Sequence, residues 1–247
     1  MVVNDFILSA EASALWIARP EFSLGERIYY AVDATWKAVG CNTNLGIILL
    51  CAPIIHAVLH SRQASLQARL AEVLSNTTQQ DAQWAFKAIR LARPAGLGAS
   101  EQHDVNHDAN CTLLEAMQAA ASKDSIAQQY SQHFQDVFTL GLMHYQAQLT
   151  RWQRPAWATT AMYLQWLATF QDSHVLRKHR IETAAYLQRE AAAHALAFNA
   201  LDNPKLYLPQ LMQFDQQLKA QQINPGTSAD LTVATLLIHH IATIVNN

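Results

Sequence analysis

The stretch that decides the fold is Gly40-Cys-Asn-Thr-Asn-Leu-Gly46, which runs directly into Ile-Ile-Leu-Leu-Cys-Ala-Pro-Ile-Ile-His-Ala-Val-Leu59. Its second part is apolar on all sides of a helix, which predicts a helix buried in a protein core. Its first part is small and polar, and it precedes backbone N–H groups that have no partner inside that helix. A second stretch has the same order, since Asn224-Pro-Gly-Thr-Ser-Ala-Asp230 leads into the apolar residues 231–245.

The two apolar runs have to be distinguished from membrane spans. Residues 45–59 and 231–245 are each shorter than the roughly 20 residues that cross a bilayer. The first run contains Pro53 and His56, and the second contains two adjacent histidines. We therefore expect core helices and no membrane partner.

Helical periodicity continues outward from these runs, and only seven glycines and seven prolines interrupt it. Alternation of the kind that predicts strands is nearly absent. The sequence therefore predicts an all-α fold, a single domain over residues 1–247 that forms a multi-helix bundle with buried central helices. We expect helices at residues 2–18, 25–39, 44–60, 64–75, 79–92, 110–122, 124–149, 155–170, 174–200, 204–221 and 228–245.

Several of these helices begin or end at residues that cap helices. Ser23-Leu-Gly-Glu26 fits a capping box, and Thr78-Gln-Gln-Asp81 is a weaker version of it. Asn203-Pro204 places an N-cap before a proline at the first helical position. Gly40 is suited to the C-terminal end of the helix before it.

Composition limits the function. The chain is 51% hydrophobic and 15% charged, against roughly 25% charged for ordinary soluble domains. Two explanations stay open, a large core and the interface of a homo-oligomer. The net charge of −2 comes without a basic block, which argues against nucleic-acid binding. Three cysteines without paired spacing, and a start without signal-peptide features, favour a reducing compartment, the cytoplasm.

Four polar islands interrupt the apolar helices, and two lie in the N-terminal half. At Asn42-Thr-Asn44 a helix start offers N–H groups and the positive end of the helix dipole to an anion; the alternative is an ordinary helix cap. The second island is the non-periodic stretch 93–110, where Glu101 and Asp104 follow Gly96-Leu-Gly98. Carboxylates there suit Mg²⁺ held through substrate phosphates, and the alternative is a solvated acidic loop.

The other two islands lie in the C-terminal half. Asp172-Ser-His-Val-Leu-Arg-Lys-His179 combines a helix cap by its first or second residue with an imidazole and two cations, Arg177 and Lys178. That set suits a polyphosphate, and the alternative is a surface charge cluster. In Asn224-Pro-Gly-Thr-Ser-Ala-Asp230, Thr227 or Ser228 is expected to cap the following helix. A turn with its cap explains these polar residues fully, but it explains less well why they lead into a helix that is otherwise too apolar to be exposed.

Two apolar helices that begin in polar loops favour a common pocket. Buried helix starts need partners for their N–H groups, and a bound phosphate would supply them. We therefore expect Asn42, Arg177 and Asp230 to lie around one cavity.

The four islands also carry a resemblance to a known family. The pieces are Asn42-Thr-Asn-Leu-Gly-Ile-Ile-Leu-Leu50, Pro94-Ala-Gly-Leu-Gly98 with Asp104-Val105, Asp172-Ser-His174 with Arg177-Lys178, and Asn224-Pro-Gly-Thr-Ser-Ala-Asp-Leu231. In order and spacing they resemble the triphosphoribosyl-dephospho-CoA synthase family, across nearly the whole chain. The residues around Asn42 and Asn224 are most similar to those of a branch found in methylotrophs and archaea.

The resemblance implies a transferase that uses ATP as substrate, with Mg²⁺ as the expected cofactor. ATP would lose adenine, and the 2′-hydroxyl of dephospho-CoA would attack the ribose carbon while the triphosphate is kept. On this reading the catalytic candidates are Asp172, Asp230 and His174, and the metal candidates are Asp104, Asp172 and Asp230. Substrate and phosphate contacts are assigned to Asn42, Thr43, Asn44, Gly46, Arg177, Lys178, Asn224, Gly226, Thr227 and Ser228.

The sequence departs from the family at its start. Family members usually carry a Lys-Pro-Gly-Asn-Val-like motif near the N-terminus, whereas this chain begins Met1-Val-Val-Asn-Asp-Phe-Ile-Leu-Ser-Ala10, which resembles a point past that motif. Two alternatives follow. One is an enzyme with a different acceptor, for example in one-carbon pterin cofactor synthesis. The other is a non-catalytic nucleotide-binding or partner protein that kept the fold.

Overall fold

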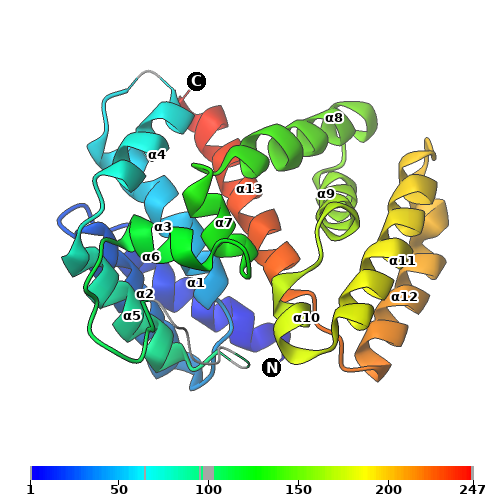
Figure 1. The fold of residues 1–247 in the computed structure, drawn as a ribbon. Helices are drawn as coiled ribbons and strands as arrows, with labels where there is room; N and C mark the ends of the chain where they lie inside the picture. The colour runs from blue at the N-terminus through cyan, green and yellow to red at the C-terminus, as the bar shows by residue number, and fades with distance from the viewer. Residues whose placement is uncertain (1, 64, 95, 97–102, 246–247) are drawn as a thin grey trace. The chain divides into compact units, whose positions relative to one another are not determined.

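The fold is all-α, as the sequence predicted. The computed structural model describes residues 2–63, 65–94, 96 and 103–245, and over these residues helices are the only regular secondary structure. The chain divides into two compact units, Met1–Phe134 and Gln135–Asn247, each of which is described by itself (Figure 1). The prediction of a single domain stays a prediction, because two compact units can belong to one domain or to two.

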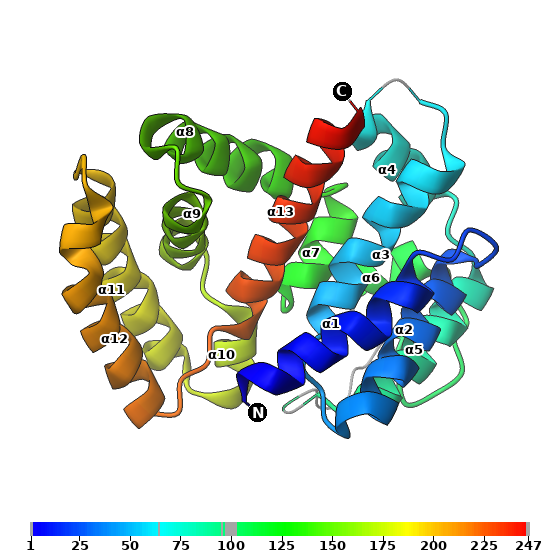
Figure 2. The same ribbon diagram turned by 180° about the vertical axis from the view of Figure 1, so that it is seen from behind.

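The first unit is built from seven helices within its described residues. α1 packs against α2, and α2 packs in turn against α5 (Figure 2). The helices are α1 (Val3–Ile17), α2 (Leu24–Val39), α3 (Leu45–His60), α4 (Leu66–Ser75), α5 (Gln79–Ala92), α6 (Leu113–Ala120) and α7 (Ser125–Ser131).

The helix α3 is the buried helix that its apolar sequence predicted. Leu50 and Ile54 are fully buried. Pro53 stands inside this helix and has no N–H, so the carbonyl of Leu49 lacks its usual donor four residues later. The hydroxyl of Tyr130, on α7, replaces that donor and binds the Leu49 carbonyl oxygen at 2.6 Å. A kink-forming residue in the core is thus matched by a buried side chain 81 residues away.

We expect Tyr130→Phe to lower the free energy of unfolding by about 2 kcal/mol, because it leaves a buried carbonyl without a donor. Tyr130 is fully buried, so water has no access to replace the hydroxyl. The measurement is urea unfolding, with the half-buried Tyr29→Phe as the control that removes a hydroxyl from the same unit. Equal stability of the two variants would contradict the role given to Tyr130.

The second unit begins with a π-helix. Its elements are η1 (Val137–Leu142), α8 (Met143–Trp152), α9 (Pro155–Thr169), α10 (Ser173–Lys178), α11 (Ile181–Asn199), the 3₁₀ turn η2 (Pro204–Tyr207), α12 (Leu208–Ala220) and α13 (Gly226–Val245). Gly141 of η1 lies against α9 and α13, since a Cβ there would approach Trp166 Cζ2 and Thr235 Oγ1 to 2.6 Å. The glycine permits this close approach.

The sequence was wrong about two long helices. The helix expected at 124–149 is broken at His133 and Phe134, whose φ angles are 50° and 59°. The helix expected at 174–200 is broken at His179, which is extended. No glycine or proline marks either break. The second break has a packing reason, because it lets Val175 of α10 and Leu187 of α11 enter the same apolar core.

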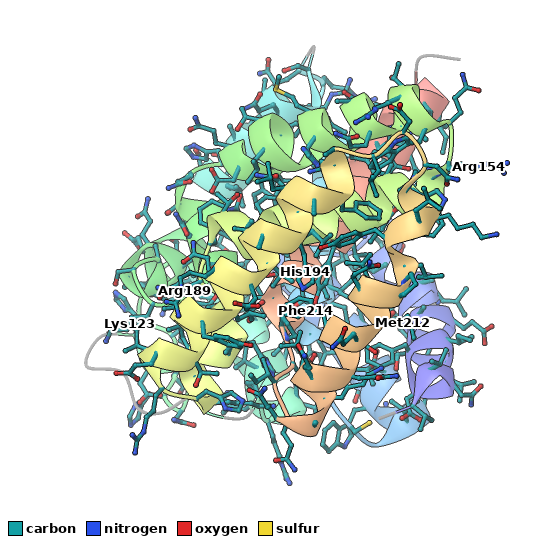
Figure 3. The ribbon with its side chains drawn as sticks, turned by 90° about the vertical axis from the view of Figure 1, so that its right-hand side faces the viewer. Lys123, Arg154, Arg189, His194, Met212 and Phe214 are labelled. Carbon is teal, nitrogen blue, oxygen red and sulfur yellow. The ribbon has the colours of Figure 1, made fainter. Side chains whose placement is uncertain are left out.

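That core of the second unit lies between α9, α11 and α12. The ring of His194 on α11 faces Phe214 on α12, with ring centroids 4.4 Å apart (Figure 3). Burial lowers the pKa of His194, and its Nδ1 lies 3.1 Å from the Tyr207 hydroxyl. The His194 imidazole is therefore part of this interface.

The predicted helix ends agree well with the structure. Ser23 and Thr78 each form a capping box with Glu26 and Asp81, respectively. Gly40 ends α2 with a φ of 67°. Asn203 accepts a hydrogen bond from the amide of Lys205, at the start of η2.

None of the described helices is long and apolar enough to span a membrane. Cys41, Cys51 and Cys111 form no disulfide, as expected from their spacing.

Candidate functional site

The third and fourth polar islands meet in the second unit, and Asp172 joins them. One oxygen of the Asp172 carboxylate accepts the N–H groups of His174 at 2.9 Å and Val175 at 3.1 Å, at the start of α10. The other oxygen accepts the N–H and the hydroxyl of Ser228, at 2.8 and 2.9 Å, in the first turn of α13. Asp172 is 3% exposed. One buried carboxylate therefore fixes two helix starts against each other.

Burial raises the pKa of the Asp172 carboxyl above its ordinary value, and the hydrogen bonds from Ser228, Val175 and His174 oppose the rise. All four partners are donors, which matches the ionised form, since a protonated carboxyl would bring a donor of its own. Asp172 thus uses both oxygens inside the protein.

Two further contacts complete this group, which we name the α10–α13 cluster (Asp172, Ser173, His174, Gly226, Thr227 and Ser228). The hydroxyls of Ser173 and Thr227 lie 3.0 Å apart and are both buried. The ring of His174 lies over Gly226, where a Cβ would come within 3.4 Å of ring atoms. The glycine leaves room for the imidazole.

The cluster corrects one prediction about helix capping. Thr227 or Ser228 was expected to cap the last helix, but α13 begins at Gly226 and places both residues inside its first turn. The Ser228 N–H is bound by Asp172 from another helix. A carboxylate of the protein therefore supplies the partner that was expected from a bound phosphate at this amide.

The remaining predicted residues of the second unit lie around the cluster. Arg177 and Lys178 are in the last turn of α10, half-buried and exposed respectively. Asp230 is half-buried in the first turns of α13, and Asn224 is exposed in the turn before it. The Asn224 carbonyl accepts the Gly226 N–H at 2.9 Å. The two cations therefore stand at the opposite end of this six-residue helix from its Asp172 cap.

The first polar island lies at the start of α3 in the first unit. The side-chain oxygen of Asn42 accepts the N–H of Leu45 at 3.2 Å, whereas Asn44, the N-cap residue, forms no capping hydrogen bond with its side chain. Thr43 and Asn44 point to α1, where they bind Ser9 at 2.6 Å and Ser13 at 3.4 Å. Gly46 lies half-buried in the first turn of α3. The predicted residues thus share one helix start.

The second island is described only in part, since Gly98 and Glu101 lie outside the described residues. Asp104 is half-buried, and one of its oxygens accepts the amide and side-chain N–H groups of Asn106, both at 2.8 Å. Arg90 of α5 donates to the carbonyls of Val105 and His107. The loop around Asp104 is therefore attached to α5.

The predicted residues fall into two groups, one in each unit. Asn42 and Asp104 belong to the first unit, and Arg177 and Asp230 to the second. The cavity expected to join them stays a prediction. Within the residues that the structure describes, no group of three or more His, Cys, Asp or Glu side chains is arranged to hold a metal ion.

Sequence reasoning missed Ser9 and Ser13, which contact the α3 start. A signal was present, because two serines one turn apart stand in a helix whose other residues are mostly apolar. Ser173 was treated as a capping alternative, but its hydroxyl instead contacts Thr227.

Comparisons with known proteins agree with this fold. The chain matches the CitG family, ATP:dephospho-CoA triphosphoribosyl transferase, over residues 1–247. It is similar in fold to a crystal structure from Archaeoglobus fulgidus of a protein provisionally described as a triphosphoribosyl-dephospho-CoA synthase, with a TM-score of 0.70 and 19% identity, over 96% of this chain and 97% of that one. The comparison with curated proteins gave no significant match. Because the family matches the whole chain, this protein belongs to the ATP:dephospho-CoA triphosphoribosyl transferase family.

Proposed function

We propose that this protein transfers the triphosphoribosyl group of ATP to the 2′-hydroxyl of 3′-dephospho-CoA and releases adenine. The bond between the ribose C1 and adenine breaks, a bond forms from C1 to the acceptor oxygen, and the hydroxyl proton leaves with adenine. The match of the family over the whole chain carries this proposal. The cluster of polar side chains around Asp172 supports it from the structure.

Arg177 and Lys178 are the proposed contacts of the triphosphate. They lie one after the other in the last turn of α10, the short helix that Asp172 caps. Guanidinium and ammonium groups form strong hydrogen bonds with phosphate oxygens. The α10 amides of His174 and Val175 are already bound by Asp172, which assigns the phosphate to the side chains and not to these amides.

Asp172 acts as a positioning residue in this proposal, and Asp230 is a candidate for the base. The four hydrogen bonds on Asp172 leave its oxygens engaged with the protein. A carboxylate near the reacting carbon would stabilise its positive charge or accept the acceptor's proton, as in glycoside chemistry. His174, whose ring lies over Gly226, is the candidate that protonates departing adenine.

Magnesium fits the donor groups only as an ion shared with the substrate. Mg²⁺ is commonly held by one or two carboxylates together with substrate phosphates and water, so it does not require an all-protein cage. Asp230 is the carboxylate of the second unit that we assign to it. When bound, the ion would neutralise part of the triphosphate charge. The free cysteines support a cytoplasmic location for the reaction.

The test is adenine release from Mg²⁺-ATP with dephospho-CoA, measured by chromatography. We expect Arg177→Gln to raise the KM for ATP about 10- to 100-fold, because it removes charged hydrogen bonds to phosphate. Arg189→Gln is the matched control, since Arg189 is an exposed arginine on α11, outside the cluster (Figure 3). The proposal is wrong if the wild type neither binds ATP nor releases adenine. Release with another acceptor alone would change the substrate and keep the reaction class.

A further inference from the structure

An open cavity of about 390 Å³ lies within the second unit, where the end of α8 meets the turn between α11 and α12. Its lining includes two tryptophans, Trp152 and Trp157, and three charged residues, Arg154, Asp202 and Lys205. Small-molecule sites in proteins are commonly about 300–1,000 Å³ in volume. None of these five residues belongs to the α10–α13 cluster, so the proposed function leaves the cavity without a role.

Hydrogen bonds fix the walls of this cavity. The indole N–H of Trp152 donates to the Leu201 carbonyl at 3.1 Å. Arg151 of α8 donates to the Asn199 carbonyl at 2.6 Å and to the Asp202 carboxylate at 2.8 Å. The end of α8 is thus bound at three points to the segment that follows α11. A cavity whose walls are held by the protein itself costs a ligand little ordering when it binds.

The two tryptophans give the cavity flat apolar surface. Trp152 is buried and packs edge to face against Phe198, with ring centroids 5.4 Å apart. Trp157 lies in the first turn of α9, 6.2 Å from the same Phe198 ring, and it is only half-buried. Packing against Phe198 explains the inner ring, whereas the exposed part of Trp157 is left to the cavity. Aromatic side chains of this kind stack on the flat face of any nucleobase.

The charges decide which ring compound fits. Arg154 and Lys205 are both exposed, and neither forms an ion pair within the residues that the structure describes (Figure 3 labels Arg154). Asp202, the carboxylate of the lining, is instead paired with Arg151 at 2.8 Å. The lining therefore keeps two cations without a partner. They repel a cationic ligand and form strong hydrogen bonds with a phosphate.

We propose that this cavity is a second nucleotide site, which binds a nucleoside monophosphate with its base against Trp157 and its phosphate toward Arg154 and Lys205. The helix α9 separates this site from Asp172, because Trp157 lies in its first turn and Asp172 follows its last residue. With 15 residues, α9 is about 22 Å long. The proposal goes beyond the transfer reaction and does not depend on it.

The test is calorimetric titration of the full chain with AMP, adenosine and inorganic tripolyphosphate. We expect Arg154→Gln and Lys205→Gln each to weaken the binding of AMP about 3- to 10-fold and to leave adenosine unchanged, because only AMP brings a phosphate. Trp157→Leu should weaken both ligands about 5-fold or more, because both carry the base. The matched controls are the exposed Arg189→Gln in the same unit and the half-buried Trp36→Leu in the first unit, which should change neither.

The proposal is overturned if the wild type binds no AMP, or if Arg154→Gln and Lys205→Gln bind AMP as the wild type does. It is also overturned if Arg177→Gln weakens AMP as much as they do, because AMP would then bind at α10. Weaker tripolyphosphate binding in Arg177→Gln alone separates the two sites. The glutamine variants replace exposed side chains, so they decide the outcome even if Trp157→Leu does not fold. A failure to release adenine would end the proposed function and leave this site intact.

Discussion

Asp172→Asn is expected to lower the free energy of unfolding by about 3–5 kcal/mol, the largest effect of any single isosteric change in this protein. The carboxylate accepts four hydrogen bonds in a buried place, and an amide offers N–H₂ in place of one oxygen. Either the α10 amides or the Ser228 donors then face another donor. Because the start of α10 loses its anchor to α13, ATP binding is expected to weaken with stability.

The measurements are urea unfolding followed by calorimetry with Mg²⁺-ATP. Asp215→Asn is the control, since Asp215 forms an exposed ion pair with Lys219 and should change stability by less than about 0.5 kcal/mol. Ser228→Ala removes one of the four donors and should cost about 1 kcal/mol, which keeps the test informative if Asp172→Asn does not fold. A decrease of less than about 1 kcal/mol in the free energy of unfolding of Asp172→Asn would show that the hydrogen bonds of Asp172 do not hold the starts of α10 and α13 together.

Gly25→Ala is expected to destabilise the first unit by about 3 kcal/mol, although alanine favours a helix by about 1 kcal/mol. A Cβ at Gly25 would lie 2.6 Å from Asp81 Cα and 2.9 Å from Trp84 Cβ. Both atoms belong to α5, whose backbone cannot yield as the end of a flexible side chain does. The Gly25 N–H also donates to the Asp81 carboxylate at 2.8 Å, so a shift of α5 would lengthen that bond.

Gly40 provides the control for this prediction, because glycine is favoured there by the backbone conformation and not by close packing. A Cβ at Gly40 would meet no atom within 4 Å, but its φ of 67° is strained for alanine. We therefore expect Gly40→Ala to cost about 1 kcal/mol, and Gly40→Asn to restore part of that loss. Thermal unfolding gives the stability of Gly25→Ala, Gly40→Ala and Gly40→Asn relative to the wild type. If Gly40→Ala costs more than Gly25→Ala, close packing is not the reason for Gly25.

The sequence located helices wherever a chemical signal marked an end. Ser23 with Glu26 and Thr78 with Asp81 are local, since each pair satisfies amides within one turn. The breaks at His133 and His179 carry no such signal, and for the second of them packing in the folded chain supplies the reason. A pattern read along the chain records periodicity but not the partner against which a helix packs.

The candidate site, like the helix ends, could be predicted from the sequence only in part. Asn42, Asp172 and Ser228 were found because short polar residues stand out where apolar helices begin. Asp172 was expected to cap one helix, and in the structure it binds donors from two helix starts. Its assignment to metal binding or proton transfer stays a prediction.

By itself the sequence determined the helical class, the buried course of residues 45–59, and the four polar islands with their resemblance to a transferase family. These features depend on composition and local periodicity, which can be read from the chain without knowing which residues pack together. Only the tertiary structure decided that Asp172 joins α10 to α13, that Tyr130 completes the hydrogen bonds around Pro53, and that the Thr43 hydroxyl contacts Ser9. The physical reason is that a hydrogen bond is set by distance and direction, and the folded chain brings together groups that lie 34 to 81 residues apart.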